Sequence, residues 1–206
     1  MQYDALMEDD SALLASAIGR RVRNERLGRR LTLDQLAEAA DVSRRMIVNI
    51  EQGATNPSVG TLLKISHALG VGLPELVEPP HSAPVSVTRR GEGAALWTGE
   101  LGGSGVLVAG TRSPNVVELW DWTLEPGEQH GSEAHTAGTK ELLQLQQGTL
   151  TVTVGGDVHD LDAGDAMTFA GDVQHEYSNR GTTRARFSLA VFEPGVGLIK
   201  KEGTHD

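Results

Sequence analysis

The apolar residues of this chain follow one period before residue 79 and another after residue 84. In the first part they recur every three to four positions, as Leu14, Ile18 and Val22 do, which is the spacing of one face of a helix. In the second part they form short runs, or alternate with polar residues, between glycine-rich turns. This second pattern is typical of antiparallel strands. We therefore predict a helical region followed by a β region.

Helix start signals divide the helical region into about five helices. The first is expected from residue 11 to about residue 30. Thr32 and Ser43 can each cap a short helix, because their hydroxyls accept hydrogen bonds from free backbone N–H groups. A fourth helix is expected to start near Ser58, and a last short turn covers residues 73–76.

The helix that starts at Ser43 has one apolar face and one strongly polar face. Arg44, Arg45 and Asn49 are expected on the polar face, pointing away from the preceding helix. Arginine and amide side chains pair well with base edges in the major groove of DNA. The pattern thus indicates a DNA-reading helix that a second helix supports.

Several sequence runs in this region resemble the phage-repressor-type (xenobiotic-response-element, XRE) helix-turn-helix family. They are TLDQLAEAADVSRRMIVNIEQG at residues 32–53, NPS at 56–58 and LLKISHALG at 62–70. The resemblance covers about residues 14–77 and implies binding to a double-stranded DNA operator. The contacts that it implies come from Arg44, Arg45, Asn49, Thr32 and Ser43.

The β region contains eight short apolar or alternating runs that we expect to be strands. They are residues 85–87, 94–97, 106–108, 116–124, 142–145, 150–154, 166–169 and 185–192. Nineteen of the 25 glycines follow residue 78, many of them in the turns between these runs. Regularly spaced short strands of this kind favour a sandwich or a barrel.

Residues 112–192 resemble the two sequence motifs of the cupin family. The matching positions are Pro126, Gly127, Glu133, His135, Glu141, Gly148, the Ala163-Gly164-Asp165 turn, His175 and Asn179. The resemblance implies a double-stranded β-helix, or jelly-roll barrel, and a helix-turn-helix joined to a cupin is a known architecture of regulators. The expected fold class is therefore α+β multidomain, with an all-α helix-turn-helix domain before an all-β cupin domain.

Four of these residues form a candidate site for a ligand or a metal: Glu133, His135, Glu141 and His175. On a strand, Glu133 and His135 would point to the same face because side chains alternate with period two. The resemblance implies that Glu141 and His175 face the barrel interior with them. Two imidazoles with one or two carboxylates suit iron(II), manganese, nickel or zinc. The alternative is a site without metal, in which the same residues bind an organic ligand or each other.

Three aromatic residues of the β region are further candidates for the ligand site. Trp120, Trp122 and Tyr177 are expected at the ligand site, although aromatic side chains also fill the core of small barrels. His130 and His159 are expected at the surface.

The composition changes along the chain and suggests where its parts begin and end. We expect an acidic disordered tail at 1–10, the DNA-binding domain at 11–78 and a proline-rich linker at 79–84. The cupin domain is expected at 85–198, and a second tail at 199–206.

The charge is distributed unevenly. The net charge is −10, but residues 11–78 hold nine basic and seven acidic residues, whereas residues 79–206 hold nine basic and 17 acidic residues. The chain has no cysteine, so disulfides and thiolate metal sites are excluded. It has neither a run of about 18 apolar residues nor a signal-peptide pattern. We therefore expect a cytoplasmic protein without a membrane partner.

These expectations combine into one functional hypothesis, one rival and a third option, which is a DNA-binding protein whose cupin domain only mediates dimerisation. The hypothesis is a sequence-specific transcriptional regulator that senses a small molecule through its cupin barrel. It would work as a homodimer, because one helix-turn-helix reads only a half-site. The rival is a mononuclear non-heme iron oxygenase, since hydroxypropylphosphonate epoxidase also resembles a helix-turn-helix joined to a cupin. His135, Glu141 and His175 match its two-histidine, one-carboxylate iron site, but the wider His135–Glu141 spacing favours a regulator without catalysis.

Overall fold

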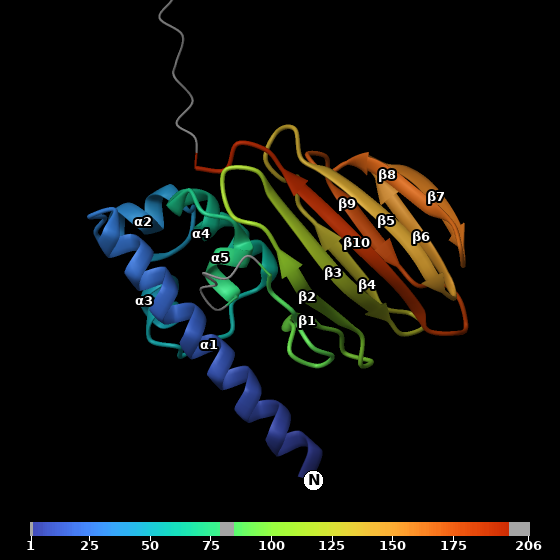
Figure 1. Ribbon diagram of the computed structural model, residues 1–206. Helices are drawn as coiled ribbons and strands as arrows, with labels where there is room; N and C mark the ends of the chain where they lie inside the picture. The colour runs from blue at the N-terminus through green and yellow to red at the C-terminus, as the bar shows by residue number, and fades with distance from the viewer. Residues whose placement is uncertain (1, 79–84, 198–206) are drawn as a thin grey trace, which may run out of the picture.

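The computed structural model describes residues 2–78 and 85–197, with side chains from residue 12 onward. Within these residues five helices precede ten strands, and the helices gather at one side of the strands (Figure 1). The predicted linker at 79–84 and the predicted C-terminal tail at 199–206 lie outside the described residues. The expected division into an all-α part and an all-β part is confirmed.

The helices are α1 (Gln2–Gly28), α2 (Leu33–Ala39), α3 (Arg44–Glu51), α4 (Val59–Leu69) and α5 (Leu73–Val77). The expectation of a disordered tail at residues 1–10 is not met, because α1 is helical from Gln2. The first 18 residues contain neither glycine nor proline, and acidic residues near a helix N-terminus interact favourably with the helix dipole. Both factors favour a helix that begins at Gln2.

The two predicted caps are formed as expected. The Thr32 hydroxyl accepts from the Gln35 backbone N–H at 3.1 Å, and the Gln35 side chain accepts from the Thr32 N–H at 2.8 Å. The Ser43 hydroxyl accepts from the Met46 N–H at 3.1 Å. These bonds fix the start of α2 and of α3, and therefore the turn between them.

The helical core lies where α1 crosses α3. Ile18 and Val22 of α1 are buried against Ile47 and Ile50 of α3 and the apolar face of α4. At the crossing, a Cβ atom on Gly19 would lie 2.2 Å from the Ile50 carbonyl oxygen, so only glycine allows this approach. The crossing holds α3 against α1 and leaves its polar face outward.

The strands form two antiparallel sheets. Their bounds are β1 (Ala94–Thr98), β2 (Ser104–Gly110), β3 (Val116–Leu124), β4 (Gln129–Ser132), β5 (Lys140–Gln147), β6 (Thr149–Val154), β7 (Asp157–Asp162), β8 (Ala166–Ala170), β9 (His175–Ser178) and β10 (Ala185–Glu193). The larger sheet has the order β1-β2-β3-β10-β5-β8, and the smaller has the order β4-β9-β6-β7. Residues 85–87, which were expected to be a strand, are exposed and form none.

Inward and outward side chains alternate along the central strands of the larger sheet. In the register of these strands, Glu118 of β3 and Glu141 of β5 both lie opposite Val191 of β10, and all three residues are buried. The two sheets meet through aromatic rings, such as Tyr177 of β9 and Phe187 of β10, whose centroids are 5.3 Å apart. The interior of the barrel is therefore partly charged and partly aromatic.

The helical part is attached directly to the barrel. The Glu75 carboxylate of α5 accepts from the Ser113 backbone N–H at 3.0 Å and from its hydroxyl at 2.7 Å. His67 of α4 lies with its Nε2 atom 3.2 Å from Glu193 Oε1 of β10. These contacts place α4 at the mouth of the barrel.

Candidate functional site

A cavity of about 440 Å³ lies between α4 and the barrel. The inner faces of β3, β9 and β10 form its walls, and Val59, Leu63 and His67 of α4 contribute to its opposite side. This volume is within the range of small-molecule sites. Because both parts of the chain line the cavity, a molecule inside it would contact both.

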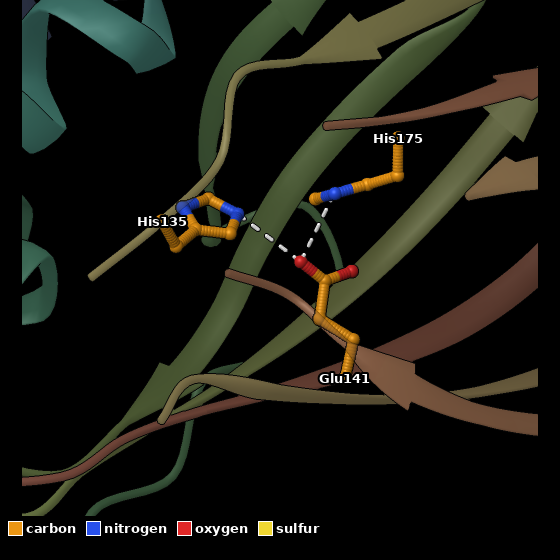
Figure 2. Close-up of side chains that lie close together, drawn as sticks. All are labelled: His135, Glu141 and His175. Atoms are coloured by element: carbon orange, nitrogen blue, oxygen red, sulfur yellow. Dashed lines mark ion pairs between the residues drawn. The ribbon is translucent and has the colours of Figure 1, made fainter. Parts of the chain in front are cut away.

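Two histidines and a carboxylate of the cavity lining point toward one another (Figure 2). His135 lies in the loop between β4 and β5, Glu141 on β5 and His175 at the start of β9. The Nε2 atoms of both histidines lie 3.1 Å from Glu141 Oε1. The backbone N–H of His135 donates to the Gly171 carbonyl at 3.0 Å, which fixes the loop beside the strands.

Neighbouring groups hold this cluster in place. The Tyr177 hydroxyl donates to the other oxygen of Glu141, and His175 Nδ1 donates to the Val173 carbonyl at 2.8 Å. Burial opposes ionisation of Glu141, but the bonds from His135, His175 and Tyr177 outweigh burial and lower its pKa to about 2. Burial also opposes the charged form of His175, yet the bond to Glu141 raises its pKa.

The cluster is compatible with a divalent metal. The three ligand atoms lie within 4.8 Å of one another. The Val173 carbonyl binds Nδ1 of His175 and so directs its Nε2 toward Glu141, as is common for metal-binding histidines. Two imidazoles and a carboxylate suit a transition metal.

Aromatic side chains form the other walls of the cavity. Trp97, Trp120 and Trp122 are all in its lining, together with Tyr177 and His130. The ring centroid of Trp122 lies 5.4 Å from that of Trp97 and 5.8 Å from that of Trp120. Trp120, Trp122 and Tyr177 were expected at such a site, whereas Trp97 was not.

The polar residues of α3 lie on the exposed surface of the helices, away from this cavity. Arg44 and Arg45 are exposed at the start of α3, and Asn49 is half-buried one turn later. The side chain of Arg44 is 59% exposed although its Nε atom lies 3.1 Å from Asp34 Oδ1. An exposed pair of this kind contributes little to stability, so the guanidinium can turn toward a partner.

Comparison with known proteins agrees with this geometry. Residues 22–76 match the family model described as Helix-turn-helix, and residues 120–192 match the family model described as Cupin domain. The chain joins a helix-turn-helix domain to a cupin domain. No described helix has the length and apolar character needed to cross a membrane.

Two relatives match this protein over most of the chain. The HTH-type transcriptional regulator SutR of Escherichia coli is 29% identical over 88% of this chain and 97% of its own length. A crystal structure of an HTH_3-family transcriptional regulator from Vibrio cholerae has a TM-score of 0.70 and 25% identity, and covers 89% of this chain and 99% of that chain. Hydroxypropylphosphonic acid epoxidase from S. wedmorenis matches with a TM-score of only 0.42 and 16% identity, which supports no statement about activity.

Glu133, the fourth predicted site residue of the cupin domain, contributes to the cavity lining but does not belong to the cluster of His135, Glu141 and His175. The side chain of Glu133 is 85% exposed, with its Oε2 atom 3.8 Å from Lys64 Nζ of α4. The expectation that it points inward with His135 is wrong, because β4 ends at Ser132 and the following residues form a loop. The alternation of side chains along a strand does not apply there.

A histidine expected at the surface belongs to the cavity instead. The ring centroid of His130 lies 4.7 Å from that of Trp122, and burial lowers its pKa to about 4. His130 is on β4, opposite Tyr177 of β9. Its only sequence signal is the alternation of four residues, QHGS, which is too short to reveal a strand. His159, on β7, is exposed as expected.

Proposed function

We propose that this protein is a transcriptional regulator that binds double-stranded DNA and responds to a small molecule held in the cupin cavity. The observation that carries the proposal is the shared cavity wall, in which α4 of the helix-turn-helix domain closes the mouth of the barrel. Binding there can bias the position of the DNA-binding domain directly. The regulator relatives, which match over most of the chain, favour this function over an oxygenase. DNA binding would place the protein in the cytoplasm.

We assign base recognition to α3. Arg44 and Asn49 would contact base edges, and Arg45 would contact bases and phosphates, because these residues line its outward face. Thr32 and Ser43 cap α2 and α3, so we assign them the placement of the two helix N-termini near the phosphate backbone.

The test compares Arg44→Ala with the unaltered protein. An operator is first selected from random duplexes by the full-length protein, and binding is then measured on that operator and on unrelated DNA. We expect Arg44→Ala to weaken operator binding by about 1–3 kcal/mol, with a much smaller loss on unrelated DNA. Arg180→Ala, at an exposed position of the cupin domain, is the control and should bind as the unaltered protein does. Equal losses on both DNAs would leave Arg44 only a phosphate contact.

We assign the effector site to the cavity and propose that His135, Glu141 and His175 can hold a divalent metal in it. The short distances between their ligand atoms support this assignment, as do the bond that Tyr177 donates to Glu141 and the bond that His175 donates to the Val173 carbonyl. A bound divalent ion would offer a Lewis-acidic position to an oxygen or nitrogen atom of the effector. Trp120, Trp122 and Tyr177 would enclose the apolar part of the effector.

We further propose that the working form is a homodimer. A row of outward side chains crosses the larger sheet, where Leu119 of β3 and Leu142 of β5 both lie opposite Ala190 of β10. Leu119 and Leu142 are 43% and 50% exposed, which makes this an apolar strip on the outer face of the barrel. Pairing two copies through such a strip would present two α3 helices to one operator.

A further inference from the structure

The cavity contains a second polar cluster besides the two histidines and Glu141. Glu118 of β3 and Glu193 of β10 both line it, with exposed fractions of 2% and 1%. Glu118 and Glu141 lie opposite the same residue of β10, so two strand spacings, about 10 Å, separate their backbones. Glu193 lies diagonally across from Glu118, nearer the mouth that α4 covers.

Each of these two carboxylates has one satisfied and one unsatisfied oxygen. Glu118 Oε2 accepts from Trp120 Nε1 at 2.9 Å, and Glu193 Oε1 lies 3.2 Å from His67 Nε2. Glu118 Oε1 and Glu193 Oε2 are buried and have no hydrogen-bond partner among the described residues. Both oxygens of Glu141, in contrast, are bonded. Buried polar atoms normally find a partner, so the two oxygens indicate a group that approaches from the cavity.

A proton shared between the two carboxyl groups does not account for this arrangement. Burial, followed by the nearby charge of Glu193, raises the pKa of Glu118 to about 8. A protonated Glu118 still needs an acceptor for its hydroxyl. Glu118 Oε1 and Glu193 Oε2 form no hydrogen bond with each other, since both lack a partner in the part of the chain that the structure describes. A donor placed between them would satisfy both atoms.

The surroundings of these oxygens favour a positively charged donor. The indole of Trp120 lies beside Glu118, and the indole of Trp122 stacks next to it. The faces of tryptophan rings attract cations, and carboxylates bind ammonium groups through charge-assisted hydrogen bonds. Two buried carboxylates and an aromatic wall together match an organic cation better than a neutral or an anionic molecule.

We infer that the effector is a small organic cation, a primary or substituted ammonium compound, whose charged group lies between Glu118 and Glu193 against the indole of Trp120. This inference rests on the proposed sensing function, because it names the chemical class that the same cavity takes. The cluster of His135, Glu141 and His175 would contact the remainder of the molecule.

Intrinsic fluorescence reports occupancy of the cavity, because the three tryptophans of the chain all line it. Full-length protein without DNA is titrated with n-butylamine, 1,5-diaminopentane and benzylamine. Each amine is compared with the alcohol of the same skeleton, and butyrate serves as the anionic probe. We expect at least one amine to bind at least about tenfold more tightly than its alcohol, and butyrate to bind more weakly than butylamine. If no amine exceeds its alcohol, the inference is wrong.

A double variant tests whether Glu118 and Glu193 cause the preference for amines. The double variant Glu118→Gln/Glu193→Gln keeps the side-chain size but cannot carry a negative charge at either position when an amine binds, and its preference for amines over alcohols should fall to about one. Glu100→Gln, at an exposed position between β1 and β2, should keep the preference. A double variant that folds and still prefers amines as strongly would also overturn the inference. If the double variant does not fold, the comparison of amine and alcohol in the unaltered protein decides.

Failure of this inference differs from failure of the proposed function. Operator binding without any preference for amines would overturn only the cationic effector. Preference for amines without operator binding would instead overturn the regulator and leave a cation-binding protein.

Discussion

Glu118 lies on the inner face of β3, where burial is the main cause that raises the pKa of its carboxyl to about 8. The charges that face it are those of Glu193 on β10, Glu141 on β5 and Glu78 after α5, and each raises this pKa further. In the unfolded chain the same carboxyl has the ordinary glutamate pKa of 4.5. The folded state therefore keeps a proton that the unfolded state has already released.

This difference gives the stability a pH dependence of definite sign. Between pH 4.5 and about 8 the contribution of Glu118 to the free energy of unfolding should fall as pH rises, by up to about 1.4 kcal/mol per pH unit. Glu118→Gln is neutral throughout and should remove this slope. Urea denaturation of both proteins at several pH values across the window checks it. Parallel slopes in the two proteins would contradict the assignment.

The cluster of His135, Glu141 and His175 leads to a second prediction about single residues. His135→Ala removes one of three donors and should abolish stoichiometric binding of zinc or nickel, whereas His159→Ala, exposed on β7, should not change it. Tyr177→Phe removes the bond that orients Glu141 and should weaken metal binding about 10–100-fold. Metal titration with dialysis and elemental analysis measures both effects. Unchanged metal binding in His135→Ala would show that the cluster does not hold the metal. The three residues would then form a ligand site through hydrogen bonds alone.

Single residues could be predicted from the sequence only where a motif carried them. His135, Glu141 and His175 match the cupin motifs, and the structure brings them together. Glu118 and Glu193 have no such signal, because alternation along a strand shows that a side chain points inward but not what faces it. Their role depends on α4 closing the barrel, which is a long-range contact that no local pattern contains.

At the scale of whole elements, the crossing of α1 and α3 depends on Gly19. A Cβ atom there would lie 2.2 Å from a backbone oxygen of α3, so Gly19→Ala must push the two helices apart. We expect a loss of about 1–3 kcal/mol in the free energy of unfolding and weaker operator binding. Chemical denaturation, monitored through the helix content, measures the loss in the free energy of unfolding.

Gly28→Ala is the matched control on the same helix. No atom lies within 4 Å of the Cβ that it adds, and alanine is the better helix former, so stability should stay equal or rise by up to about 1 kcal/mol. Similar losses in both variants would show that the crossing is not the cause.

The sequence predicted the elements that have strong local signals. Thr32 and Ser43 mark the starts of α2 and α3 because their side chains form the caps themselves. β4 has only four residues, and β7 (DVHDLD) is almost entirely exposed at the end of the smaller sheet. A strand that buries neither face shows no apolar alternation. β7 therefore forms because it pairs with β6, and its own sequence carries no strand signal.

At the scale of the whole molecule, the apolar strip on the larger sheet predicts how two copies pair. Leu119→Glu and Leu142→Glu each place a charge in the strip and should convert the proposed dimer to a monomer, with weaker binding to a two-fold symmetric operator. Val158→Glu, an exposed valine on β7, is the control. Sedimentation of the full-length variants measures the oligomeric state. Leucine variants that remain dimeric would place the contact elsewhere.

The position of α4 at the mouth of the barrel limits how such a protein can change during evolution. Val59 and Leu63 belong to the domain that binds DNA, yet they line the same cavity as Trp120 and Glu193. Recombination at the junction between the domains would pair a new helical domain with an old barrel and join two half-cavities that were never selected together. Under the proposed function, residues of both domains would therefore determine which effector binds, and substitutions on either side of the junction would change the effector specificity.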